Sequence, residues 1–213
     1  MPDMNDQKSV RYPMPIFTPR LVLRPLLPED GAVLYNDKKN AWESLSKVFE
    51  WTAHGLSLEA DEAYVAKAFQ DYLDGTDLSL VALERATGAS VLYTGLHDLN
   101  RGKWNNIPPQ IPGETKEFQI GFWATAAGQG KGYAEEASNA LIRYAFNALA
   151  ADRIRMCHSE FNKASPKILG KLGFTLDTVL ENSLHMAGGK VVDAHWYSMT
   201  STAPLPELKV RWG

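Results

Sequence analysis

The stretch Ala126-Ala127-Gly128-Gln129-Gly130-Lys131-Gly132-Tyr133-Ala134-Glu135-Glu136-Ala137 decides how this chain is expected to fold. It joins an apolar, strand-like segment, residues 118–125, to a helical segment that runs from Gly132 to about Ala150. Glycines at alternate positions let a backbone approach a ligand closely. At the start of a helix the main-chain N–H groups have no intrahelical acceptor and the macrodipole is positive, so a phosphate group is favoured there. The stretch therefore predicts a pyrophosphate-binding loop.

Two common phosphate loops do not fit these residues. The Walker A loop needs Gly-Lys followed by Ser or Thr, but Gly132 is followed by Tyr133 and Ala134. The dinucleotide-binding pattern fails in both registers, because Tyr133 or Glu135 stands where a third small residue is required. The pattern that remains, Gln129-x-x-Gly132-x-Ala134, resembles the [QR]-x-x-G-x-[GA] signature of the GCN5-related N-acetyltransferases (GNAT), whose loop holds the pyrophosphate of acetyl-CoA. The alternative is a glycine-rich turn without a ligand.

Three further segments resemble the RimJ/RimL-type branch of the same superfamily. They are the opening Thr18-Pro19-Arg20-Leu21-Val22-Leu23-Arg24-Pro25, the element Asn162-Lys163-Ala164-Ser165 followed by Lys171-Leu172-Gly173-Phe174, and the last strand Asp193-Ala194-His195-Trp196-Tyr197-Ser198-Met199. Four elements in the right order, over residues 16–200, identify the chain as a member of this superfamily. The resemblance implies an α/β (α+β) fold with a central mixed, mostly antiparallel sheet of about six to seven strands flanked by helices.

Composition limits the classes of protein that fit. The chain has 213 residues, 45% of them hydrophobic and 22% charged, and a formal net charge of −3. We expect one soluble domain over residues 16–200, a flexible lead-in over 1–15 and a tail over 201–213. The net charge gives no reason to expect nucleic acid or membrane as a partner, whereas a homodimer stays open. Cys157 is the single cysteine and the N-terminal segment has no apolar core, so we expect a cytoplasmic protein. No residue spacing indicates a metal site.

Hydrophobic periodicity predicts the other elements. Helices are expected over residues 28–39 and 58–73, a hairpin over 78–84 and 90–99, and strands over 21–25, 154–158, 174–180 and 191–200. Between the first two helices an aromatic stretch from Trp42 to Trp51 either packs in the core or forms a wall of the acceptor site. The long segment 100–116 either helps to define the acceptor through Trp104 or is a hairpin extension.

The resemblance also implies which residues hold the cofactor. Main-chain groups at the end of the strand before the loop would hold the pantetheine arm and polarise the thioester; here these are Trp123, Ala124 and Thr125. The pyrophosphate would lie on the N–H groups of the loop and helix start, with the side chain of Lys131 as an optional cation. These groups belong to Gln129, Gly130, Lys131, Gly132, Tyr133 and Ala134. Asn162 would reach the pantetheine amides directly or through a water.

The acid and the base are less well defined. Many superfamily members carry a tyrosine seven residues after the asparagine, but Leu169 stands there, so the resemblance leaves Ser165 as the acid for the departing thiolate. Ser165 followed by Pro166 is also a helix start, with Ser165 as the N-cap. For the base, Gln119 stands where the branch commonly has a glutamate, and an amide does not accept the proton at neutral pH. Glu117 shares its strand face and is the candidate base. Reserve candidates are His97, His158, Glu160 and Tyr197.

These residues predict an acetyl-CoA-dependent N-acetyltransferase that acts by direct attack of a primary amine on the thioester. The acceptor is either the N-terminal α-amino group of a protein, such as a ribosomal protein, or a small-molecule amine. A non-catalytic acyl-CoA-binding sensor or structural domain is the alternative, and Gln119 and Leu169 are the departures that support it.

Overall fold

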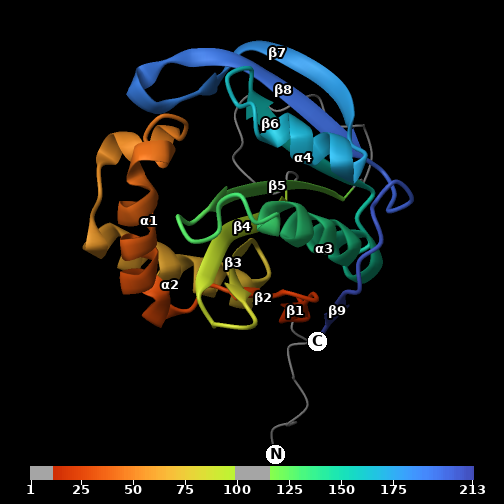
Figure 1. Cartoon of the computed structure of the whole chain (residues 1–213), viewed down its shortest axis with the longest axis horizontal. Helices are drawn as coiled ribbons and strands as arrows, with labels where there is room; N and C mark the ends of the chain where they lie inside the picture. Colours follow the sequence, from red (N-terminus) through yellow and green to blue (C-terminus); the bar gives the residue numbers. More distant parts are fainter. Residues whose placement is uncertain (1–11, 99–115) are drawn as a thin grey trace, which may run out of the picture.

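A computed structural model describes residues 12–98 and 116–213 of the chain (Figure 1). In chain order the elements are β1 (Ile16–Phe17), β2 (Leu21–Pro25), η1 (Pro28–Asp30), α1 (Gly31–Leu45), η2 (Glu50–His54), α2 (Leu58–Asp74), β3 (Leu78–Glu84), β4 (Ser90–Asp98), β5 (Glu117–Ala124), α3 (Tyr133–Ala148), β6 (Arg153–Ser159), α4 (Ser165–Leu172), β7 (Thr175–His185), η3 (Ala187–Gly189), β8 (Val191–Met199) and β9 (Arg211–Trp212).

The strands form one sheet in the order β7-β8-β6-β5-β4-β3-β2-β1-β9. Every neighbouring pair is antiparallel except β5 and β6, which are parallel. The predicted mixed, mostly antiparallel sheet flanked by helices is confirmed. Within residues 12–98 and 116–213 it has nine strands, more than the expected six to seven, because β1 and β9 are additional two-residue strands. Segments this short show no alternation of polar and apolar residues, so no sequence pattern marks them.

Both ends of the described chain pack against this sheet. Tyr12 is buried, and its hydroxyl donates to the carbonyl of Gly75 at 3.4 Å. At the other end β9 pairs with β1, and the ring of Trp212 meets that of Tyr144 edge-on at 5.6 Å. Tyr12 and the segment around Trp212 therefore pack on the domain body, and the division into a lead-in over 1–15, a domain over 16–200 and a tail over 201–213 stays a prediction. The rest of the lead-in, residues 1–11, lies outside the described residues.

Helices cover both faces of the sheet. On one face the apolar side of α3, with Leu141 and Tyr144 fully buried, packs against Phe118 and Ile120 of β5 in the larger core cluster. The other face carries a smaller cluster that joins α1 and α2 to β3 and β4; its buried members are Leu26, Leu34, Val65, Ala68, Val81 and Tyr93. In Figure 1 α1 and α2 lie together at the left, and α3 and α4 cross the sheet near β5 and β6. On its own face of the sheet α3 thus packs directly against β5, the strand that leads into the glycine-rich loop.

Local signals explain where the helices begin and end. The side chain of Ser57 caps α2 by accepting the N–H of Ala60 at 3.2 Å, and Gly75 ends it at φ +62°. The first helix runs to Leu45 instead of residue 39, so Trp42 belongs to α1 and Trp51 to η2. None of the helices in the two described ranges is long and apolar enough to cross a membrane.

Candidate active site

The loop between β5 and α3 has the backbone that its glycines predict. Gly130 and Gly132 adopt φ of +72° and +77°, values that residues with a Cβ rarely adopt. The first helical hydrogen bond of α3 runs from the N–H of Glu136 to the carbonyl of Gly132, at 3.2 Å. The N–H groups of Tyr133, Ala134 and Glu135 therefore precede the hydrogen-bond ladder and point out of the positive end of the helix. An anion is favoured at this position.

Gly128 has a different role from the other two glycines. A Cβ at this position would lie 1.9 Å from the carbonyl oxygen of Val91 in β4. The N–H of Gly128 donates to the carbonyl of Thr125 at 2.9 Å, and the N–H of Thr125 donates to the same Val91 oxygen at 3.1 Å. The close approach that was expected to serve a ligand is thus made to the sheet, and it holds the start of the loop against β4.

Two residues assigned to cofactor binding have their main-chain donors engaged within the protein. The N–H of Thr125 donates to Val91 and its hydroxyl donates to the carbonyl of Ser90 at 3.1 Å. The N–H of Gln129 donates to the carbonyl of Thr125 at 3.2 Å, and its side-chain amide lies 3.5 Å from the hydroxyl of Ser44 on α1. Neither N–H is therefore free for pantetheine or phosphate. This corrects the expected set of phosphate-binding N–H groups, which begins with Gly130 and not with Gln129.

Strands β5 and β6 diverge next to this loop. They pair only over Glu117↔Arg153, Phe118↔Ile154 and Gln119↔Arg155, whereas β5 stays paired with β4 as far as Ala124. Hydrogen-bonded pairs alternate along an antiparallel ladder, and Thr125 with Val91 is such a pair. Trp123 therefore directs its main-chain groups towards β4, while Ala124 and Phe122 direct theirs towards the diverging β6. Of the predicted strand residues only Ala124 has these groups available, and Phe122 joins it.

Glu117 lies at the base of this divergence and is fully buried. One of its carboxylate oxygens accepts the Nε–H of Arg155 at 2.7 Å, and the other lies 3.7 Å from Nε of Arg153. Arg155 also donates to Asp177 on β7 at 2.5 Å. A general base has to reach its substrate or a water, and a carboxylate enclosed by two guanidinium groups does not. The expectation that Glu117 is the base does not fit this placement; it holds β5 to β6.

Gln119 occupies the same strand face, one step nearer the divergence. Its side-chain amide lies 3.6 Å from Sγ of Cys157 on β6. The amide oxygen is buried and has no hydrogen-bond partner within the described part of the chain. Burial raises the pKa of the Cys157 thiol to about 12, so it stays protonated at neutral pH. This pair supplies no base.

Asn162 and Ser165 form one unit at the start of α4. The side-chain oxygen of Asn162 accepts the N–H groups of Ala164 and Ser165, both at 3.0 Å, so Asn162 caps this turn. Its amide donates to Oγ of Ser165 at 2.9 Å. Ser165 makes no capping bond, which corrects the alternative in which it is the N-cap. Because its oxygen accepts from Asn162, the hydroxyl hydrogen of Ser165 is directed elsewhere and is available to an acceptor.

Of the four reserve candidates, His97, His158 and Tyr197 make contacts within the protein. His97 pairs with Asp77 at 2.8 Å, and Glu160 is exposed. Ring nitrogen Nδ1 of His158 lies 2.8 Å from the carbonyl of Ser159, and the imidazole stacks on Tyr197 at 5.3 Å. Burial lowers the pKa of His158, so its neutral form is favoured. Trp104 lies outside the described residues.

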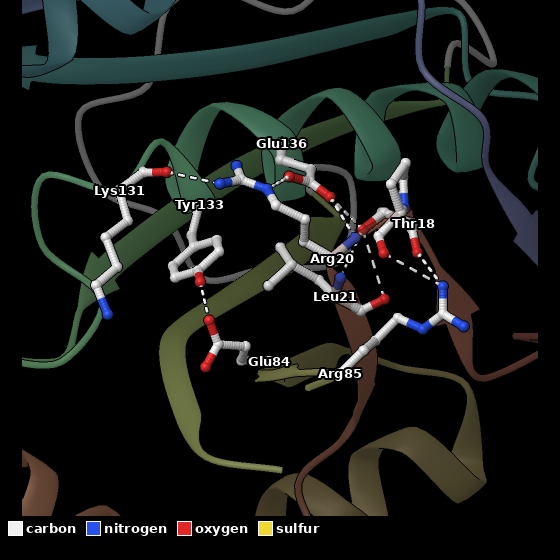
Figure 2. A network of polar contacts seen from close by, with 9 residues as sticks. Thr18, Arg20, Leu21, Glu84, Arg85, Lys131, Tyr133 and Glu136 are labelled. Atoms are coloured by element: carbon white, nitrogen blue, oxygen red, sulfur yellow. Dashed lines mark hydrogen bonds and ion pairs between the residues drawn. The ribbon is translucent and has the colours of Figure 1, made fainter. Parts of the chain in front are cut away.

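The opening segment has a role at the site that the sequence did not reveal (Figure 2). Glu136, buried on α3, accepts the Thr18 hydroxyl at 2.6 Å, the N–H of Arg20 at 3.0 Å and Nε–H of Arg20 at 2.5 Å. Arg20 also donates to the carbonyl of Lys131 at 2.9 Å. The Tyr133 side chain points away from the loop to Glu84, with its ring beneath the Arg20 guanidinium. The only signal of this role was the resemblance of residues 18–25 to a family opening.

A helix-start anion site beside two diverging strands is the arrangement expected of an enzyme that handles an acyl-coenzyme A. The family comparison agrees. Residues 20–175 match the acetyltransferase (GNAT) domain family, and the chain belongs to this family of acyltransferases. The resemblance to the GNAT superfamily is therefore confirmed. Within residues 12–98 and 116–213 no three His, Cys, Asp or Glu side chains are placed to hold a metal ion; the expectation of a metal-free site stays a prediction.

Several of the similar proteins are named as ribosomal-protein acetyltransferases. YdaF of Bacillus subtilis (strain 168), a proposed ribosomal N-acetyltransferase, is 29% identical over 73 residues; this match spans 34% of the chain and only 40% of the relative. The fold resembles the ribosomal-protein-S5-alanine acetyltransferase of Vibrio fischeri, with a TM-score of 0.74 at 16% identity, over 91% of this chain and all of the other. It also resembles RimL, a ribosomal L7/L12 α-N-protein acetyltransferase in complex with coenzyme A. That TM-score is 0.73 at 16% identity, over 87% of this chain and 97% of RimL. The fold is thus of the RimJ/RimL type.

Proposed function

We propose that the chain is an acetyl-CoA-dependent N-acetyltransferase whose acceptor is the α-amino group at the N-terminus of a protein, such as a ribosomal protein. The observation that carries the proposal is the loop after β5, where the donors at the start of α3 adjoin the strand edge that β6 leaves unpaired. A pyrophosphate and a pantetheine arm need these two features side by side. RimL, which has this fold, binds coenzyme A.

Different main-chain groups bind the pyrophosphate and the pantetheine arm. The N–H groups of Gly130, Lys131, Gly132, Tyr133 and Ala134 hold the pyrophosphate at the positive end of α3. Free main-chain groups of Phe122 and Ala124 hold the pantetheine arm and polarise the thioester carbonyl. The amide of Asn162 is occupied by Ser165, so Asn162 orients this hydroxyl besides any contact with pantetheine.

In the transfer step the amine nitrogen forms a bond to the acetyl carbon while the bond from that carbon to sulfur breaks. The hydroxyl of Ser165 donates its proton to the departing thiolate and regains one from the solvent. Neither Glu117, enclosed by arginines, nor Gln119, an amide, takes the proton of the acceptor. The acceptor therefore attacks as the free amine already present in solution, and its nitrogen, positively charged once it is bonded to the acetyl carbon, then loses a proton to water to give the neutral amide.

This need for free amine favours one class of acceptor. An α-amino group has a pKa of about 7.7–8.0, whereas a lysine side chain has one of about 10.4. At pH 7 about a tenth of the former but less than a thousandth of the latter is unprotonated. Small-molecule amines with pKa values near 10 share the disadvantage of lysine. An N-terminal α-amino group is accordingly the acceptor served best when neither Glu117 nor Gln119 of β5 acts as the base.

The test is thiol release from acetyl-CoA with matched peptides. One set has a free N-terminus and no lysine, another has a blocked N-terminus and one lysine, and small primary amines form the third. We expect turnover with the first set, with kcat/KM rising with pH in parallel with the unprotonated fraction of the α-amino group. Turnover confined to lysine or small amines would overturn the acceptor class. Coenzyme A binding without thiol release from any set would overturn the proposed reaction.

A further inference from the structure

We infer that Arg20 is a positioning residue for the phosphate loop: it holds the carbonyl of Lys131 and thereby turns the N–H of Gly132 towards the pyrophosphate. The inference rests on the proposed function of this loop. Arg20 lies more than a hundred residues before the loop in the sequence, at the corner between β1 and β2. Figure 2 shows its guanidinium between the α3 carboxylate of Glu136 and the carbonyl of Lys131.

The two ends of the Arg20 fork contact different partners. Nε donates to Glu136 at 2.5 Å and one terminal nitrogen donates to the carbonyl of Lys131 at 2.9 Å. The guanidinium also lies over the ring of Tyr133, 4.6 Å from its centroid. Because the guanidinium group is planar and rigid, fixing Nε on the helix fixes where the terminal nitrogen points. Arg20 thus fixes the position of the loop relative to the first turn of α3.

The contact between Arg20 and the carbonyl of Lys131 also sets the direction of the next main-chain donor, the N–H of Gly132. In a trans peptide the C=O and N–H vectors point in opposite directions within one plane. Since the carbonyl of Lys131 points to Arg20, the N–H of Gly132 points to the opposite side of the loop. Gly132 itself has φ of +77°, a conformation that glycine leaves readily, so the local sequence does not hold it. Arg20 supplies the missing restraint.

The attachment of the β1–β2 corner to α3 does not depend on the Arg20 side chain alone. Glu136 also accepts the hydroxyl of Thr18 at 2.6 Å and the backbone N–H of residue 20 at 3.0 Å. A change of the Arg20 side chain therefore leaves Glu136 with two donors and the β1–β2 corner attached to α3. Arg85 offers a matched control, because it donates to the carbonyls of Thr18 and Pro19 at the same corner and does not contact the loop.

The experiment compares two acetyl donors, acetyl-CoA and S-acetyl-pantetheine, which lacks the pyrophosphate. For Arg20→Gln we expect KM for acetyl-CoA and Kd for coenzyme A to rise about tenfold, the loss typical of one hydrogen bond to a charged group. We expect kcat at saturation and kcat/KM for S-acetyl-pantetheine to stay as in the wild type. Arg85→Gln should change none of these quantities. Arg20→Lys should share the defect of Arg20→Gln, because one ammonium does not reproduce the fork.

The outcomes separate the inference from the function on which it rests. A wild-type protein that binds no coenzyme A would overturn both. Normal coenzyme A binding by folded Arg20→Gln would overturn the inference alone, as would full recovery in Arg20→Lys, which would show a simple charge effect. An equal loss with both acetyl donors would also overturn it, because a general distortion does not discriminate between them. If Arg20→Gln does not fold, Arg20→Lys, which keeps the charge opposite Glu136, carries the same test.

Discussion

Replacing Gly128 with alanine tests whether the loop is held against β4 by close backbone contact. The added Cβ would lie 1.9 Å from the carbonyl oxygen of Val91 and 2.8 Å from its carbonyl carbon. Neither atom is the end of a flexible side chain, so the loop or the strand has to move. Overpacking of this kind costs about 1–3 kcal/mol. The movement also strains the hydrogen bond from Thr125 to the same oxygen, which adds about 1 kcal/mol.

We therefore expect Gly128→Ala to lower the free energy of unfolding by about 3 kcal/mol, a fall in Tm of about 6–12 °C for a domain of this size. Urea unfolding followed by circular dichroism measures it. Two other glycines calibrate the result. Gly130→Ala meets no atom within 4 Å but keeps a φ of +72°, so it should cost about 1–2 kcal/mol. Gly170→Ala, in open space within α4, should stabilise the helix by about 0.5–1 kcal/mol.

The order of these three variants is the decisive result. If Gly128→Ala unfolds at the wild-type urea concentration, the contact with Val91 does not constrain the loop. If it is no worse than Gly130→Ala, backbone conformation rather than close approach accounts for both glycines. The expected order also has a functional side: coenzyme A binding by Gly128→Ala should weaken, because the displaced loop carries the donors of α3 with it.

Three further predictions follow from the site. Ser165→Ala should lower kcat about tenfold or more with little change in stability. Asn162→Ala should cost about 1 kcal/mol of stability, because Asn162 is the cap. A stability loss in Ser165→Ala with unchanged turnover would contradict these roles. Glu117→Gln should lower the free energy of unfolding by about 3 kcal/mol, as expected for a broken buried ion pair, and leave the pH profile of kcat/KM unchanged; an altered profile would restore Glu117 as the base. Burial lowers the pKa of His158 in the folded state, so its contribution to stability is present above the unfolded pKa of about 6.5 and is lost as the pH falls towards the folded pKa. The urea midpoint of His158→Gln should accordingly fall less between pH 7 and about pH 5 than that of the wild type, and equal falls would refute the assignment.

Much of the fold could be predicted from the sequence, because the signals that determine it are local. The glycine pattern of residues 128–132 indicated both the strand-to-helix turn and its anion-binding backbone, and Gly130 and Gly132 adopt the left-handed conformation. The helix over 58–73 was predicted nearly to its ends, since its apolar stripe and Gly75 lie within a few residues of one another. These signals act over one or two turns, and such distances are visible in a linear chain.

The tertiary structure decided which of these residues are free to act. Glu117 has the chemistry of a base, but Arg155, 38 residues later, encloses it once β5 and β6 pair. Gly128 is required by Val91, 37 residues earlier, and Arg20 reaches Lys131 across 111 positions. The resemblance to the family motif singled out residues 18–25, but it did not show that Arg20 contacts Glu136 and Lys131. Residue type sets what a side chain is able to do, whereas burial and contact with distant segments set whether it is available, and only the folded chain brings those segments together.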